Sequence, residues 1–162
     1  NHGLYKLSRE NENFENSIEV NALSKFKFLK IFEDIALSDE NLIQKEIWIN
    51  TSEAEIFPAL NPSYEISKSL IGKLVSFKKN LMDIKTKEKL KIKKIILGPF
   101  KSELNPIGIM RPELVSKKIY ELANSKNYLI IISPNPLTYL IFPLKEFLNF
   151  LYSKVIYNYN SL

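Results

Sequence analysis

The stretch YLIIISPNPLTYLIFPLKEFLNFLY, residues 128–152, is the densest apolar run in the chain, and it decides the fold that we expect. Residues 128–132 and 137–142 are rich in β-branched and aromatic residues, which favours two strands. Between them, residues 133–136 read Ser-Pro-Asn-Pro, and two prolines so close together stop a helix and mark a turn. The stretch therefore predicts a β-hairpin. Both strands are apolar at nearly every position, which indicates burial on both faces.

The sequence changes period after Pro143, where we expect a helix to begin. Proline suits the first helical position, because its missing N–H has no partner there in any case. The apolar residues that follow share one helical face: Leu144, Phe147, Leu148, Leu151, Tyr152 and Val155. Polar loops at strand ends often carry ligand sites, but we interpret residues 133–136 as a rigid turn. The prolines also exclude a membrane span, which needs about 20 apolar residues.

The N-terminal third of the chain is expected to be helical. Apolar residues keep helical spacing over residues 18–37, with Lys25 on the outward face. Ser38 then has the character of an N-cap. We expect it to begin a second helix that includes Ile47. Trp48, the one tryptophan, is expected in the core or at its edge.

Two later helices have clear start signals. Asn61-Pro62 combines an N-cap residue with proline at the first helical position, and the apolar pattern that follows predicts a helix to residue 81. Lys68 lies on the outward face of that helix. Arg111-Pro112 begins another helix, which we expect to continue to Ala123. Residues 52–55 have the spacing of a capping box.

Residues 82–97 alternate apolar residues with lysine, which predicts a short amphipathic hairpin whose solvent face is covered with lysine. Within the lysine-rich segment 78–94, such a face is a candidate polyanion-binding site. Its residues are Lys85, Lys87, Lys89, Lys91, Lys93 and Lys94. A simpler interpretation is a solvated face that protects a strand edge from aggregation. Nucleic-acid recognition is less expected, because the chain holds only two arginines, Arg9 and Arg111.

Composition excludes several kinds of chemistry. The chain has 162 residues and a net charge of +5, with no cysteine and with His2 as its only histidine. Thiolate nucleophiles, a Ser-His-Asp triad and most zinc sites are therefore excluded. Its four glycines fit no phosphate-binding loop. We accordingly predict no catalytic residues, no cofactor and no metal. An enzyme built on this sequence would need carboxylate, tyrosine or lysine chemistry.

The domain organisation follows from these patterns. Residues 1–17 are polar and weakly patterned, and we interpret them as a flexible tether. Residues 18–162 are expected to form a single α+β domain. It would contain N-terminal helices, two β-hairpins in a small mixed sheet, and a C-terminal helix.

A resemblance rests on the N-terminal residues and the general composition. The chain begins Asn1-His2-Gly3 without methionine, continues with a leader rich in Asn, Glu and Ser, lacks cysteine, and uses Lys, Asn and Ile heavily. In these respects it resembles the envelope and surface lipoproteins of Borrelia-type spirochaetes, as a mature chain without its lipidated cysteine. The resemblance implies an N-terminal lipid anchor in place of a transmembrane segment. It also implies a location in the cell envelope, at the outer surface or in the periplasm.

These observations favour a non-enzymatic, surface-exposed domain of the cell envelope that binds a macromolecular partner, either a protein or a glycan. The alternative is a basic module that binds a polyanion or nucleic acid through the lysine-rich segment 78–94. An enzyme is the third interpretation.

Overall fold

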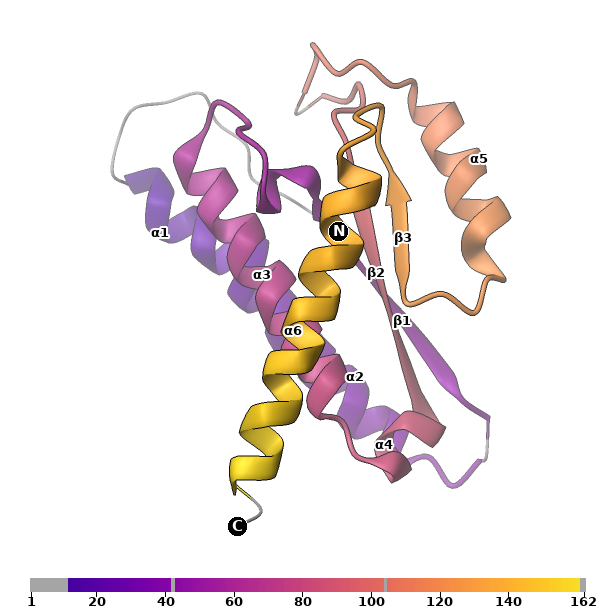
Figure 1. Ribbon diagram of the computed structural model, residues 1–162. Coiled ribbons are helices and arrows are strands. Elements are labelled where there is room, and N and C mark those ends of the chain that lie inside the picture. Colours follow the sequence, from indigo (N-terminus) through magenta and orange to yellow (C-terminus); the bar gives the residue numbers. More distant parts are fainter. Residues whose placement is uncertain (1–11, 42, 104, 161–162) are drawn as a thin grey trace.

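The computed structural model describes residues 12–41, 43–103 and 105–160, which form a three-stranded sheet between helical layers (Figure 1). Its elements, in chain order, are α1 (Glu12–Ile18), the π-helical turn η1 (Glu19–Leu23), α2 (Ser24–Ser38), β1 (Lys45–Ser52), the 3₁₀ turn η2 (Glu53–Glu55), α3 (Pro62–Leu81), α4 (Ile84–Lys89), β2 (Leu90–Leu97), α5 (Pro112–Ala123), β3 (Leu129–Ile132) and α6 (Thr138–Asn160). The predicted single α+β domain is confirmed. The predicted pair of hairpins is wrong.

The sheet is entirely parallel, with the strand order β1-β2-β3. Lys45 pairs with Leu90 at the start of the β1–β2 ladder, and Lys94 pairs with Leu129 at the start of the β2–β3 ladder. Parallel neighbours need long crossover connections. Here α3 and α4 lie between β1 and β2, and α5 lies between β2 and β3. All three strands therefore end at the same edge of the sheet.

The predicted hairpin at residues 82–97 is instead a helix followed by one strand. Asp83 caps α4, because its side chain accepts a hydrogen bond of 2.7 Å from the Thr86 amide. Residues 90–97 then form β2, the central strand, which is buried at almost every position. The lysines of β2 therefore do not form a solvent face, because helices cover both sides of a central parallel strand.

The predicted hairpin at residues 128–142 is also wrong. Residues 129–132 form β3, but residues 137–142 lead into and begin α6. The Asn135 side chain accepts a hydrogen bond from the Leu137 amide, and the Asn135 carbonyl accepts one from Thr138, so the chain turns directly into a helix. Pro143 lies inside α6 instead of at its start. Short apolar runs are compatible with either a strand or a helix, and here the helix forms.

The N-terminal half contains one further correction. Ser38 is the last residue of α2 and begins no second helix, since residues 45–52 form β1. The predicted helices over 18–37, 62–81 and 112–123 are confirmed by the α1–η1–α2 segment, α3 and α5. Of the predicted tether, residues 1–11 lie outside the described residues, whereas residues 12–17 belong to α1.

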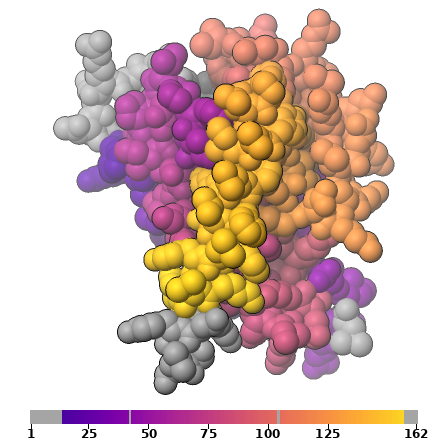
Figure 2. Space-filling model, in the orientation of Figure 1, coloured from indigo at the N-terminus to yellow at the C-terminus, as the bar shows by residue number. Residues whose placement is uncertain are grey.

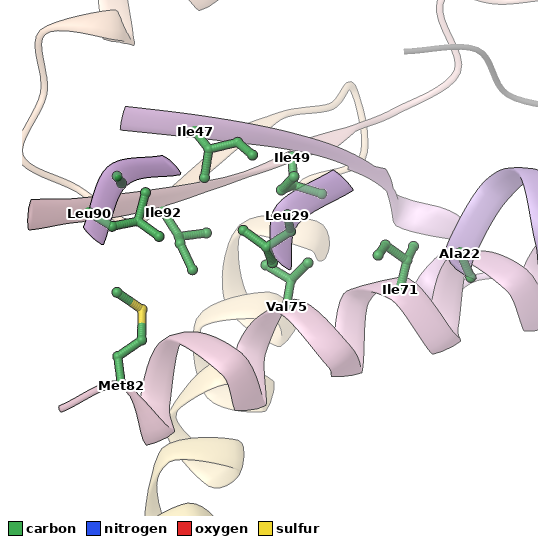
Figure 3. Close-up of a cluster of buried hydrophobic side chains, with 10 residues drawn as sticks. Ala22, Leu29, Ile47, Ile49, Ile71, Val75, Met82, Leu90 and Ile92 are labelled. Carbon is green, nitrogen blue, oxygen red and sulfur yellow. The ribbon is translucent and has the colours of Figure 1, made fainter. Parts of the chain in front are cut away.

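Two apolar cores flank the sheet. On one face, Ile47, Ile49 and Ile92 pack against Leu29 of α2 and Val75 of α3 (Figure 3). The other face packs against α5 and contains Ile95, Leu97, Met110, Val115, Ile130 and Ile132, with Trp48 at its edge as predicted. The two crossovers move the same way across the sheet but place α3 and α5 on opposite faces. One of the two connections, β1 to β2 or β2 to β3, must therefore be left-handed, although crossovers between parallel strands are nearly always right-handed.

Helix α6 crosses the front of the molecule as an outer ridge (Figure 2). Phe142, on the inner side of α6, is completely buried. The outward side of α6 carries a continuous exposed apolar stripe, which consists of Leu140, Leu144, Phe147, Leu148, Leu151 and Val155. In the described part of the chain, no helix has the length and apolar character needed to cross a membrane.

Candidate functional site

A pocket of about 440 Å³ opens at the carboxyl edge of the sheet. Its walls come from the end of β1 and the segment that follows it (50–54 and 58–60), from the end of β2 and its loop (97–100, with Ser102, Asn105, Ile107 and Ile109), and from three side chains of flanking helices, Lys25, Tyr64 and Lys68. In open α/β sheets, ligands bind outside the carboxyl ends of the strands. The pocket has that position and the size of a small-molecule site.

Glu53 is the carboxylate that lines this pocket. It follows β1 directly, where the Ser52 hydroxyl caps η2 by accepting a hydrogen bond of 3.2 Å from Ala54 N. Glu53 Oε2 accepts hydrogen bonds from Ser133 Oγ and, at 3.2 Å, from Thr138 Oγ1. Among the described residues, Oε1 accepts none. The carboxylate is thus held by one oxygen, which leaves the other to receive hydrogen bonds from a ligand.

Ser133 gives this arrangement its rigidity. Its hydroxyl accepts a hydrogen bond of 3.0 Å from the Asn135 amide, and its carbonyl accepts one of 3.2 Å from the Tyr139 hydroxyl. The Ser-Pro-Asn-Pro segment is therefore a compact turn, as expected. Beyond this expectation, the turn also orients the pocket carboxylate of Glu53.

Two lysines form the basic part of the pocket. Lys68 of α3 is only 5% exposed, and its Nζ lies 5.3 Å from the centre of the Tyr64 ring. Burial, together with the positive charge of Lys25, lowers the pKa of Lys68 to about 7. Burial also lowers the pKa of Lys25. Neither ammonium group is within salt-bridge distance of a carboxylate of the described residues.

The mouth of the pocket is apolar. Leu60, Ile107 and Ile109 line it, and their exposed fractions are 80%, 80% and 75%. Leu60 has a left-handed backbone, with φ at 58°. Gly108 allows the loop after β2 to fold tightly, because a Cβ there would collide with the backbone of Phe100. Exposed apolar side chains grouped around a polar interior are typical of an interaction surface.

A buried ionic network supports the segment that carries Glu53. Lys94 of β2 donates to Glu55 and to Glu146, in both cases at 2.9 Å, and Lys145 donates to Glu55 at 2.8 Å. The Glu55 carboxylate occupies the space that a side chain at position 72 would fill, since a Cβ on Gly72 would collide with it. Two lysines and two glutamates balance in charge, which is what burial requires. The network therefore joins η2, β2 and α6 as a structural unit.

The structure does not bring the six predicted polyanion-binding lysines together on one surface. Lys85 and Lys87 are exposed on α4, whereas Lys89 donates to the Asp39 carbonyl. Lys91 pairs with Glu46 at 2.9 Å. Lys93 and Lys94 are fully buried on opposite faces of the sheet. Lys93 pairs with Glu46 at 3.1 Å and also donates to the Ala123 carbonyl.

The pocket residues were not predicted as a site. Lys25 and Lys68 have the sequence pattern of outward-facing helix lysines, and residues 52–55 have only that of a capping box. The residues meet through folding, because Lys25, Glu53 and Lys68 belong to three different elements. The one local signal is the Ser-Pro-Asn-Pro segment, for which the sequence favours a rigid turn over a ligand site.

No protein-family model matches the chain. Among curated proteins, it is 38% identical over 153 residues to a monoglucosyldiacylglycerol epimerase of Synechocystis sp. (strain ATCC 27184 / PCC 6803 / Kazusa). The matched region covers 94% of this chain and 36% of that protein, so the chain spans about a third of the length of the curated relative.

This similarity contradicts the expectation of a non-enzymatic binding domain, and it contradicts the alternative of a polyanion-binding module as well. It points to an enzyme, which the sequence alone favours less than either binding function. The resemblance to spirochaete lipoproteins, the lipid anchor and the macromolecular partner are not tested by it and stay predictions.

Proposed function

We propose that this chain is part of an enzyme that acts on the sugar headgroup of a glycosylated diacylglycerol, and that the headgroup occupies the pocket at the carboxyl edge of the sheet. The pocket itself is the observation that carries the proposal. It combines a polar interior with an apolar mouth, which matches the two parts of a glycolipid. The similarity to the epimerase supports the same substrate class.

The polar interior suits sugar hydroxyls. Carboxylate and amide groups are good partners for hydroxyls, because they accept or donate in fixed directions. The pocket offers the Glu53 carboxylate together with the side chains of Asn50, Ser52, Ser102 and Asn105. Glu53 is the group best placed to accept a hydroxyl proton, because Ser133 and Thr138 hold its other oxygen.

The apolar mouth suits the diacylglycerol. Leu60, Ile107 and Ile109 extend outward from the same pocket and are at least 75% exposed. Contact with acyl chains would remove their apolar surface from water, which stabilises a complex by about 25 cal/mol per Å². We therefore place the chain at a membrane surface while it acts, with the pocket directed toward the lipid.

Binding to lipid vesicles tests this function. The chain should bind vesicles that contain monoglucosyldiacylglycerol more tightly than matched vesicles that contain unglycosylated diacylglycerol. Glu53→Gln should weaken the sugar-dependent part by about tenfold or more, because a hydrogen bond to a charged group contributes about 1.5–3 kcal/mol. Conversion of the glucosyl headgroup to an epimer, followed in the same vesicles by analysis of the released sugar, tests catalysis.

Glu88→Gln is the matched control, because Glu88 is an exposed glutamate on α4, outside the pocket lining. It should bind like the unchanged chain. Equal binding to glycosylated and unglycosylated vesicles, with no effect of Glu53→Gln, would contradict the assignment of the headgroup to this pocket.

A further inference from the structure

A neutral sugar calls for no positive charge, yet one side of the pocket carries two lysines. Lys68 projects from the second turn of α3, and Lys25 lies across from it at the start of α2. The π-helical turn η1 (Glu19–Leu23) directly precedes α2. Such turns are frequent at functional sites. Two lysines from separate elements thus meet in one cavity.

Lys68 is buried and Lys25 is partly buried, and placing two ammonium groups close together there is unfavourable where no carboxylate of the described residues pairs with them. Other buried lysines of this protein are paired: Lys94 contacts Glu55 and Glu146 at 2.9 Å, and Lys93 contacts Glu46 at 3.1 Å. Among the described residues, Lys68 has no carboxylate within salt-bridge distance, and the Tyr64 ring, at 5.3 Å, compensates weakly. The charges that act on Lys68 are those of Lys25 from α2 and Glu55 from η2. Glu55 is already bonded to Lys94 and Lys145.

We propose that Lys25 and Lys68 form a phosphate-binding subsite within the pocket, for a phosphate group carried either by a soluble ligand or by a lipid. A phosphate oxyanion supplies the negative charge that the two ammonium groups lack, and it accepts hydrogen bonds from both. The subsite goes beyond the proposed function, because it does not depend on a sugar.

Phosphate binding should be coupled to protonation. With the pKa of Lys68 near 7, this amine is mostly neutral at pH 8 in the empty pocket. A bound phosphate favours the charged amine and therefore raises its pKa. Binding at pH 8 should thus take up close to one proton. At pH 6, where Lys68 is already charged, its contribution to proton uptake should be close to zero.

Isothermal titration calorimetry with inorganic pyrophosphate tests the subsite in solution. Measurements at pH 8 in buffers of different ionisation enthalpy should show the proton uptake. Lys68→Met and Lys25→Met should each weaken binding at least tenfold, and Lys68→Met should abolish the uptake. Lys73→Met is the control, because Lys73 is an exposed lysine of the same helix, and it should change neither quantity. Circular dichroism establishes that the variants are folded.

A second arm identifies the source of the phosphate. The same variants are tested for binding to vesicles that contain phosphatidylglycerol. Lysine-dependent binding of pyrophosphate indicates a soluble phosphate ester, whereas lysine-dependent binding to the vesicles alone indicates a lipid phosphate. Either result supports the subsite. If neither ligand binds in a way that depends on Lys25 and Lys68, the proposal is wrong, whatever the outcome of the sugar experiments.

Discussion

Gly72 is a residue at which a single added methyl group should destabilise the fold. A Cβ there would collide with the Glu55 carboxylate, which is fully buried and held by Lys94 and Lys145. We expect Gly72→Ala to lower the free energy of unfolding by about 3–5 kcal/mol, because it displaces one member of a buried ionic network. Alanine's better helix propensity, about 1 kcal/mol, offsets only part of this loss.

Urea unfolding measures the effect of Gly72→Ala, and Ser69→Ala on the exposed side of α3 is the control, expected within about 0.5 kcal/mol of the unchanged chain. In a Glu55→Ala background, Gly72→Ala should cost much less, because the two residues share one space. Additive losses would show that the carboxylate is not what position 72 accommodates.

Lys68 should make stability depend on pH. Its pKa is about 7 in the folded chain and 10.5 as the reference value, so the unfolded state binds more protons between these values. The free energy of unfolding should therefore rise with pH from 7 toward 10. Below pH 7, Lys68 is charged in both states, and the cost of burying its charge lowers the stability in full. Lys68→Met removes this penalty, so it should stabilise the protein more at pH 6 than at pH 9. Urea unfolding of the unchanged chain and of Lys68→Met between pH 6 and pH 9 checks this prediction. A difference in stability that does not change with pH would refute it.

At the scale of elements, two apolar residues of α6 differ sharply in burial. Phe142 is completely buried, whereas Leu148 on the same helix is 56% exposed. Phe142→Ala should therefore lower the free energy of unfolding by about 3–5 kcal/mol. Leu148→Ala should change it by about 0.5 kcal/mol or less. Similar losses from both substitutions, measured by urea unfolding, would mean that the outer stripe of α6 is also packed in solution.

The elements also show what the sequence could predict. The starts of α3 and α5 were predictable, because Asn61-Pro62 and Arg111-Pro112 act locally. Residues 137–142 were not, since a short apolar run suits a strand as well as a helix. Burial of the β2 lysines could not be predicted either, because Lys94 is separated from its partner Glu55 by 39 positions in the sequence. The pocket could not be predicted for the same reason, because Lys25, Glu53 and Lys68 come together only in the folded chain.

At the scale of the whole molecule, one sheet supplies both cores. Side chains of β2 alternate between the α3 face and the α5 face, so loss of this strand exposes both cores. We expect a single cooperative unfolding transition. Trp48 fluorescence reports the α5 face, and far-UV circular dichroism is dominated by the helices on the other face. The two transitions in urea should coincide, and separate midpoints would show that the faces unfold independently.

The parallel connectivity has an electrostatic consequence. Because each strand ends at the same edge, the helix that follows it begins near that edge: α3 after β1, α5 after β2 and α6 after β3 (Figure 1). A helix start carries roughly +0.5 of an elementary charge, so three such partial charges gather around the pocket end. The molecule should therefore carry a permanent dipole with its positive pole at the pocket. Near an anionic bilayer it would rotate pocket-first before contact, and added salt should slow association more than it speeds release.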